Sequence, residues 1–158
     1  MTFVDFSYST LWAILPEIAL LALAGLVMLY DLLWQETRKR ALGIITAVGL
    51  GLIIVLTLIF SRPADPDVLI FGGMLRDDWV AFIFRLIFLF AALITSLTSL
   101  DVEHIGDKGE YYAILLASTF AMFLMAESAN LLMAYLSLEF VSLTSYILTG
   151  FLKHNRRS

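Results

Sequence analysis

Five long apolar blocks, separated by shorter polar connections, dominate the pattern of this sequence. The blocks predict helices at about residues 11–33, 41–60, 79–100, 110–126 and 130–152. A helix of roughly 20 apolar residues, rising about 1.5 Å per residue, is long enough to cross a hydrocarbon core about 30 Å thick. The pattern therefore predicts an all-α fold, a polytopic membrane helix bundle with five transmembrane helices.

Composition agrees with a membrane protein and excludes several kinds of site. Hydrophobic residues make up 61% of the chain and charged residues 15%, against about 45–50% and about 25% in soluble domains. Cysteine is absent, which excludes thiolate-bound zinc and iron–sulfur clusters. The two histidines, His104 and His154, fall in polar connections, where they cannot hold a haem within the membrane. We therefore expect no cofactor on this chain, and the absence of nucleotide motifs leads us to expect no nucleic-acid partner.

The basic residues predict how the helices cross the membrane. One side of the predicted bundle carries Arg38, Lys39, Arg40, Lys108, Lys153, Arg156 and Arg157. The other side carries Arg62 and Arg76, in a connection that also contains four aspartates. Loops rich in lysine and arginine stay in the cytoplasm. The N-terminus is therefore predicted outside and the C-terminus in the cytoplasm.

Glu139 is the most informative polar position, because it lies near the middle of the fifth apolar block. It is about nine residues, or roughly 14 Å, from the polar start of the helix. A charged side chain at that depth costs at least about 2.5 kcal/mol, and such residues usually bind or transfer an ion or a proton. Helical spacing places Tyr135, Ser142 and Tyr146 on the same face, where their hydroxyls are expected to hydrogen-bond the carboxyl or hold water. A purely structural hydrogen bond between helices is the alternative.

The remaining polar residues within the apolar blocks have simpler interpretations. Arg85 lies about two turns into the third helix, where it is expected to reach the membrane surface or pair with Asp78, as a structural or interfacial ion pair. Glu127 flanks the short connection between the last two helices and is expected at the membrane interface. The hydroxyls of Ser118 and Thr119 are expected to hydrogen-bond the backbone of their own helix.

Several motifs together resemble one family. Leu15-Pro16-Glu17-Ile18 opens the first helix, Arg85 supplies a basic residue in the third, and the run Leu-Glu-x-x-Ser-Leu-x-Ser-Tyr surrounds Glu139. With the segment 109–152, these motifs resemble the antiporter-like subunit N of respiratory complex I, the proton-pumping NADH:quinone oxidoreductase. The related subunits M and L usually carry Trp-Glu where this chain has Leu138-Glu139.

The resemblance implies a function and a location. Glu139 would be the proton-coupling residue of a membrane-arm subunit, in an enzyme whose redox centres lie on other chains. Its partners would be the other membrane-arm subunits and the lipid bilayer, in an inner or plasma membrane, with the bacterial cell membrane expected. Residues 1–108 would form three leading helices, and 109–158 the start of an antiporter-like repeat. We expect a longer polypeptide to complete that repeat.

Two other classes of function remain open at this stage. The chain could belong to a multi-subunit cation/proton antiporter or a membrane-bound hydrogenase, because these complexes share the same ancestral membrane module. It could also be a structural fragment without transport. Co-purification with a flavin-containing, quinone-reactive arm would favour complex I.

Overall fold

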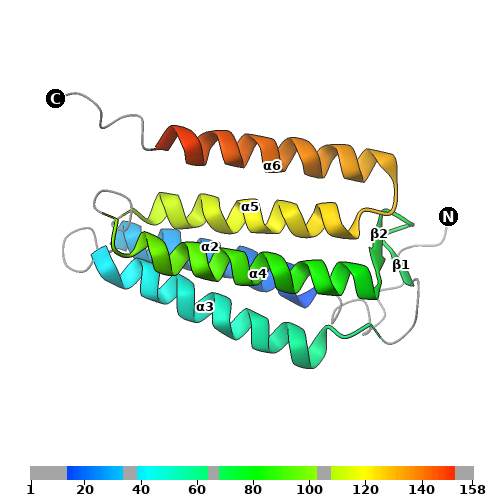
Figure 1. The fold of residues 1–158 in the computed structure, drawn as a ribbon, viewed down its shortest axis with the longest axis horizontal. Coiled ribbons are helices and arrows are strands. Elements are labelled where there is room, and N and C mark those ends of the chain that lie inside the picture. Colours follow the sequence, from blue (N-terminus) through cyan, green and yellow to red (C-terminus); the bar gives the residue numbers. More distant parts are fainter. Residues whose placement is uncertain (1–13, 34–38, 64–67, 103–107, 152–158) are drawn as a thin grey trace.

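The computed structural model describes residues 14–33, 39–63, 68–102 and 108–151, which form a bundle of helices with a small β-hairpin at one end (Figure 1). The elements, in chain order, are α2 (Leu15–Leu33), α3 (Lys39–Phe60), β1 (Val68–Ile70), β2 (Leu75–Asp77), α4 (Trp79–Ser99), α5 (Gly109–Glu127) and α6 (Leu131–Phe151). The predicted beginning of the first helix at residue 11 and the predicted end of the last at 152 lie outside the described residues.

The described helices confirm the prediction of five membrane-spanning segments. Each is 19 to 21 residues long over its apolar part and is hydrophobic enough to cross a bilayer. At about 1.5 Å per residue, these lengths match a hydrocarbon core of about 30 Å. The chain is therefore a multi-pass membrane protein, whereas the direction in which it crosses the membrane remains a prediction.

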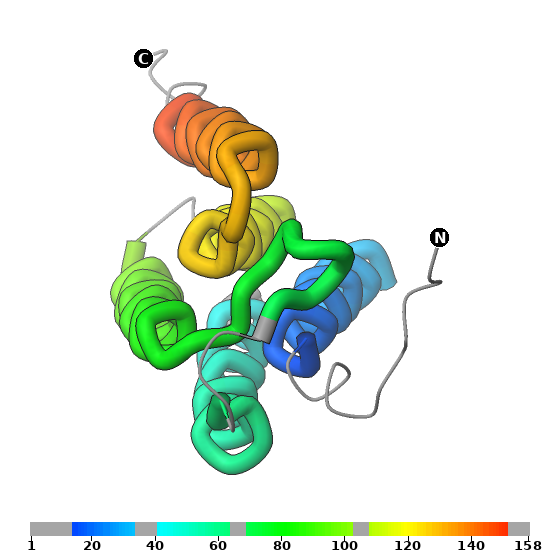
Figure 2. Tube along the Cα trace, turned by 90° about the vertical axis from the view of Figure 1, so that its right-hand side faces the viewer, coloured from blue at the N-terminus to red at the C-terminus, as the bar shows by residue number. Residues whose placement is uncertain are grey.

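Helix α5 lies at the centre of the bundle, between α2, α4 and α6 (Figure 2). Its position explains why so many of its side chains are buried, including Tyr112, Leu116 and Phe123. Leu20 and Val27 of α2 join these residues in the core. The other buried core residues are Leu42, Leu50, Ile53 and Ile54 of α3, Leu89 and Ala92 of α4, and Tyr111 of α5.

Helix α6 lies at the edge of the bundle, beyond α5 (Figures 1 and 2). Its main contact is with α5, and only Ser137 and Thr144 of its residues are buried. Most of its surface is therefore open in this chain, although its sequence is as apolar as that of a spanning helix. In a membrane, this surface must face lipid or other protein.

The connection between α3 and α4 contains a β-hairpin that the sequence analysis did not predict. β1 and β2 pair antiparallel, with Leu69 opposite Arg76. Gly72 and Gly73 have positive φ angles in the turn, a conformation that glycine adopts without steric cost. Ala129, in the α5–α6 connection, donates its N–H to the carbonyl of Met74 at 2.9 Å. The hairpin thus contacts one end of the bundle, which we call the hairpin end.

Glycine allows close helix packing towards the opposite end. A Cβ on Gly43 of α3 would meet the side chains of Leu100 and Tyr112, and a Cβ on Gly109 of α5 would lie 2.5 Å from Cβ of Asp31 in α2. Side chains in well-packed interiors have little room to move aside. These glycines therefore determine how closely the helices approach.

Candidate functional site

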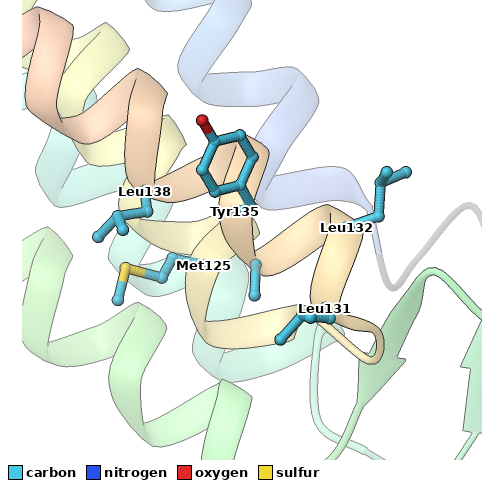
Figure 3. Close-up of a pocket in the computed structure, with 6 residues that line it drawn as sticks. Met125, Leu131, Leu132, Tyr135 and Leu138 are labelled. Carbon is cyan, nitrogen blue, oxygen red and sulfur yellow. The ribbon is translucent and has the colours of Figure 1, made fainter.

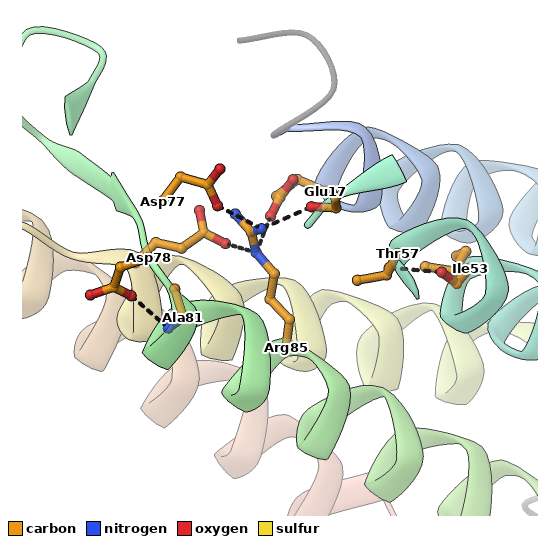
Figure 4. A network of polar contacts seen from close by, with 9 residues as sticks. Glu17, Ile53, Thr57, Asp77, Asp78, Ala81 and Arg85 are labelled. Carbon is orange, nitrogen blue, oxygen red and sulfur yellow. Dashed lines mark hydrogen bonds and ion pairs between the residues drawn. The ribbon is translucent and has the colours of Figure 1, made fainter. Parts of the chain in front are cut away.

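Four charged side chains from four different elements meet at the hairpin end (Figure 4). Glu17 lies in the first turn of α2, Asp77 ends β2, Arg85 lies two turns into α4, and Glu127 ends α5. The chain enters α2 and α4 at this end and leaves α5 there, so all three helices place these residues at a similar level. We call these four residues the Arg85 cluster.

Arg85 is the centre of the cluster. Its Nε lies 3.1 Å from Oε1 of Glu17 and 2.5 Å from Oε1 of Glu127. Its Nη1 lies 3.2 Å from Oδ1 of Asp77 and donates a hydrogen bond to Oγ of Ser61 at 3.0 Å. Arg85 is 1% exposed, Glu17 3% and Glu127 2%. The guanidinium thus binds carboxylates of three other elements in the interior of the protein.

The predicted pairing of Arg85 with Asp78 is wrong. Asp78 is the N-cap residue of α4 and accepts a hydrogen bond from the N–H of Ala81 at 2.7 Å. Its other oxygen lies 3.0 Å from Nε of Arg76. A carboxylate at an N-cap is held by the free N–H groups of the helix start, whereas the Arg85 side chain turns into the bundle. The Arg85 side chain lies inside the bundle, where it is 1% exposed, and its depth in the membrane remains a prediction.

None of the three acids of the cluster was recognised from the sequence as a partner of Arg85, and two of them, Glu17 and Glu127, lie in other helices. Glu127 was expected at the membrane interface, but its carboxylate is buried against Arg85. The signal that could have identified both was depth. Each acid lies at the end of a predicted span on the same side of the membrane as Arg85, and an arginine within a span needs such partners.

Asp77 closes the cluster from outside the helices. Burial raises the pKa of the Asp77 carboxyl above its ordinary value, although the positive charge of Arg85 acts in the opposite direction. The nearby carboxylates of Glu127 and Asp78 also raise this pKa. Three carboxyls around one guanidinium therefore make an electrostatically crowded site.

Glu139 lies on the open surface of α6, outside the Arg85 cluster. Tyr135 and Tyr146 are exposed on the same helix, by 60% and 72%, and Glu139 is exposed as well. The Ser142 hydroxyl donates to the carbonyl of Leu138 at 2.9 Å, so it bonds its own helix. The predicted polar face therefore exists, but it points away from α5, and the hydrogen bonds expected around Glu139 remain predictions.

An open apolar groove of about 660 Å³ lies beside this face, where α5 meets the first turns of α6 (Figure 3). Its lining residues are Met125, Leu131, Leu132, Ala134, Tyr135 and Leu138. Tyr135 and Leu138 connect the groove to the position of Glu139. An apolar groove of this kind is compatible with lipid chains or with the side chains of a further helix.

Several hydroxyls within the helices bond only locally. Thr119 donates to the carbonyl of Leu115 at 2.9 Å, as predicted. Thr46 and Thr57 of α3 make the same contact with the carbonyl four residues earlier. Within the described parts of the chain, no group of three or more His, Cys, Asp or Glu side chains is arranged to hold a metal ion.

Sequence comparisons identify relatives of the whole chain. It is 35% identical to NADH-quinone oxidoreductase subunit N 1 of Roseiflexus castenholzii, over 98% of this chain and 34% of that protein. It is 37% identical to NADH-quinone oxidoreductase subunit N of Dehalococcoides mccartyi, over 91% of this chain and 30% of that protein. NAD(P)H-quinone oxidoreductase subunit 2 of Trichormus variabilis is 36% identical over 92% of this chain and 28% of its own length.

No family model matches the chain. The relatives nevertheless confirm the resemblance stated above, because their identity with this sequence extends over nearly all of it. The chain spans about a third of the length of the curated relatives it matches. It is thus homologous to part of NADH-quinone oxidoreductase subunit N, and the match is consistent with the N-terminal part of that subunit.

Proposed function

We propose that this chain is part of a membrane-arm subunit of a proton-pumping NADH:quinone oxidoreductase, and that Glu139 takes up and releases protons during transport. The similarity to subunit N supports the first part of the proposal. The position of Glu139 supports the second part, because the residue is the ninth of the 21 residues of α6.

The open face of α6 is the observation that carries the proposal. A carboxylate exposed to lipid near the middle of a bilayer is strongly unfavourable. Glu139 must therefore be covered by other protein, be protonated, or both. We propose that further helices of the same subunit or of a neighbouring membrane-arm subunit cover this face and supply the polar partners for Glu139.

The proposed mechanism is electrostatic. Quinone reduction elsewhere in the complex changes the charge near Glu139, and a nearby charge changes the proton affinity of a carboxyl. Tyr135 and Tyr146 lie one and two turns away on the same helix, where their hydroxyls would line a path for water. The redox chemistry itself belongs, in this proposal, to other chains.

We propose a bacterial cell membrane as the location, with the hairpin end outside the cytoplasm. This orientation follows from the predicted distribution of basic residues. It places the Arg85 cluster near the outer surface and Glu139 between the two surfaces. Residues 1–108 would then form the leading helices and 109–158 the start of the antiporter-like repeat.

The test is Glu139→Gln in the full-length subunit, within the assembled complex in lipid vesicles. We expect slower proton pumping with the amount of assembled complex unchanged, because glutamine keeps the shape of the side chain and cannot ionise. Thr149→Ala is the control and should leave pumping unchanged, since the Thr149 hydroxyl bonds to carbonyls of its own helix and is not part of the polar face around Glu139. Unchanged proton pumping in the Glu139→Gln complex would contradict the proposed role of Glu139.

A further inference from the structure

The Arg85 cluster contains more negative charge than its arginine can neutralise. Glu17, Asp77 and Glu127 all lie within ion-pair distance of the same guanidinium. Full ionisation of the three carboxyls would leave two negative charges without compensation. Both glutamates are nearly inaccessible to solvent, and uncompensated charges in such an environment are strongly unfavourable.

The hydrogen-bond geometry is also incomplete. The oxygens nearest to Nε of Arg85 belong to Glu17 and Glu127, yet that nitrogen carries one hydrogen. Nε donates it to Glu127. Among the described residues, neither oxygen of Glu17 has a hydrogen-bond partner, although the residue is only 3% exposed. The Glu17 carboxyl is therefore a buried acceptor that faces the cluster without a donor.

A proton on one of the two glutamates would relieve both difficulties. It would supply the missing donor and lower the uncompensated negative charge of the cluster from two to one. Asp77 is the most exposed of the three carboxylates, at 14% of its side chain, and Ser61 adds only a hydroxyl. Two carboxyls in close contact commonly share one proton in this way.

We infer that Glu17 and Glu127 share a single proton beside Arg85, so that the Arg85 cluster is a proton-binding site at the hairpin end of the bundle. The helix ends affect the two glutamates differently. Glu17 lies at the positive N-terminal end of α2 and Glu127 at the negative C-terminal end of α5. The proton is assigned to the pair because an oxygen of each glutamate approaches the same nitrogen of Arg85. This inference concerns residues other than Glu139 and does not rest on its proposed role.

Infrared spectroscopy of the native polypeptide, in the assembly purified from membranes, tests the inference. The C=O stretch of a protonated carboxyl is separate from that of a carboxylate and shifts in deuterated water. We expect such a signal at neutral pH in the wild-type protein. One component of it, the signal of the Arg85 cluster, should be lost in both Glu17→Gln and Glu127→Gln, because each variant removes one of the two glutamates that share the proton.

Two controls distinguish this site from other carboxyls. Glu110→Gln changes an exposed glutamate of α5 and should leave the signal unchanged. Glu139→Gln should leave the signal of the Arg85 cluster unchanged, even if it removes a separate signal of Glu139 itself, so failure of this inference and failure of the proposed function give different results. If neither Glu17→Gln nor Glu127→Gln removes any protonated-carboxyl signal, the inference is overturned.

The wild-type protein alone also provides a decisive test. Absence of a protonated-carboxyl signal at neutral pH would overturn the inference even if the variants did not accumulate. A signal that appears only after sodium is removed would likewise overturn it, because the compensating charge would then be a sodium ion. Persistence of the signal in sodium buffer supports a proton.

Discussion

Arg85 and Glu139 are both ionisable residues within apolar helices, yet their surroundings in this chain are opposite. Arg85 is almost completely buried and contacts acids from α2, β2 and α5. Glu139 lies on the open face of a helix whose main contact is α5. The charge of Arg85 is therefore balanced by acids of this chain, whereas Glu139 requires an interaction partner outside the described residues.

This difference indicates that Arg85 is needed for the arrangement of the helices, whereas Glu139 is not. The Arg85 cluster joins three helices and the hairpin, so its charges contribute directly to the arrangement of the bundle. Glu139 contributes nothing visible to that arrangement. A residue that is costly in the membrane and unused in the fold is the kind of residue that a transport function retains.

Removal of Arg85 should have the largest effect. Arg85→Met leaves three carboxyls without their cation, and loss of one partner of a buried ion pair costs about 3–5 kcal/mol. We expect a large fall in the free energy of unfolding, measured by denaturant titration of the purified subunit in detergent. Arg76→Met is the matched control, because Arg76 is 46% exposed and such pairs contribute at most about 1 kcal/mol. Equal losses in the two variants would contradict the comparison.

Glu139→Leu should have the second largest effect and the opposite sign. A charged residue at the centre of a spanning helix raises its insertion free energy by about 2.5 kcal/mol or more. We expect the segment 131–151 to insert more efficiently with leucine, measured in a translocon insertion assay. The same substitution in the full-length subunit should slow proton transport. Unchanged insertion would mean that Glu139 lies away from the membrane centre.

Substitutions of one glycine in the packed core and one in the open helix α6 extend the comparison. Gly43→Ala places a Cβ against Leu100 and Tyr112, and overpacking of this kind costs about 1–3 kcal/mol. Gly150 of α6 has no atom within 4 Å of the equivalent position, so Gly150→Ala should be neutral or slightly stabilising. Thermal unfolding of both variants measures the difference. Equal destabilisation would show that α6 is packed as tightly as α3.

The smallest effect concerns the pH dependence at Asp77. Burial raises the pKa of this carboxyl, so the folded protein holds the proton more tightly than the unfolded chain. The stability contributed by Asp77 is therefore greatest below its ordinary pKa and falls as the pH rises towards the raised value. Asp77→Asn should remove this fall, measured as the free energy of unfolding against pH. Parallel curves for the two proteins would contradict the assignment.

Each helix that corresponds to a single apolar block could be predicted from the sequence alone. The described bounds of α3, α4 and α5 differ from the predicted spans by at most two residues. The hairpin could not be found in this way, because its strands have three residues each. So short a strand carries no periodic signal, and the hairpin is held by tertiary contacts, among them those with residues 128 and 129 and the Asp77–Arg85 ion pair.

The candidate site residues likewise include one that could be found from the sequence and others that could not. The sequence identified Glu139 by its depth, since the cost of a charge within a bilayer depends only on position along an apolar helix. It failed for Arg85, whose expected partner Asp78 instead caps α4. Residues that are neighbours along one helix can be identified from their spacing in the sequence. Glu17 and Glu127 lie in other helices than Arg85, so spacing could not identify them as its partners.

The sequence by itself thus determined the five apolar segments that are long enough to span a membrane and the position of Glu139 within the fifth, because hydrophobicity and helix length are local properties. The tertiary structure decided which charges meet. It brought Glu17, Arg85 and Glu127 together across more than a hundred residues of chain and left Glu139 on an open face. The reason is that electrostatic partners are set by how helices pack side by side, and that packing depends on the shapes of all their surfaces together.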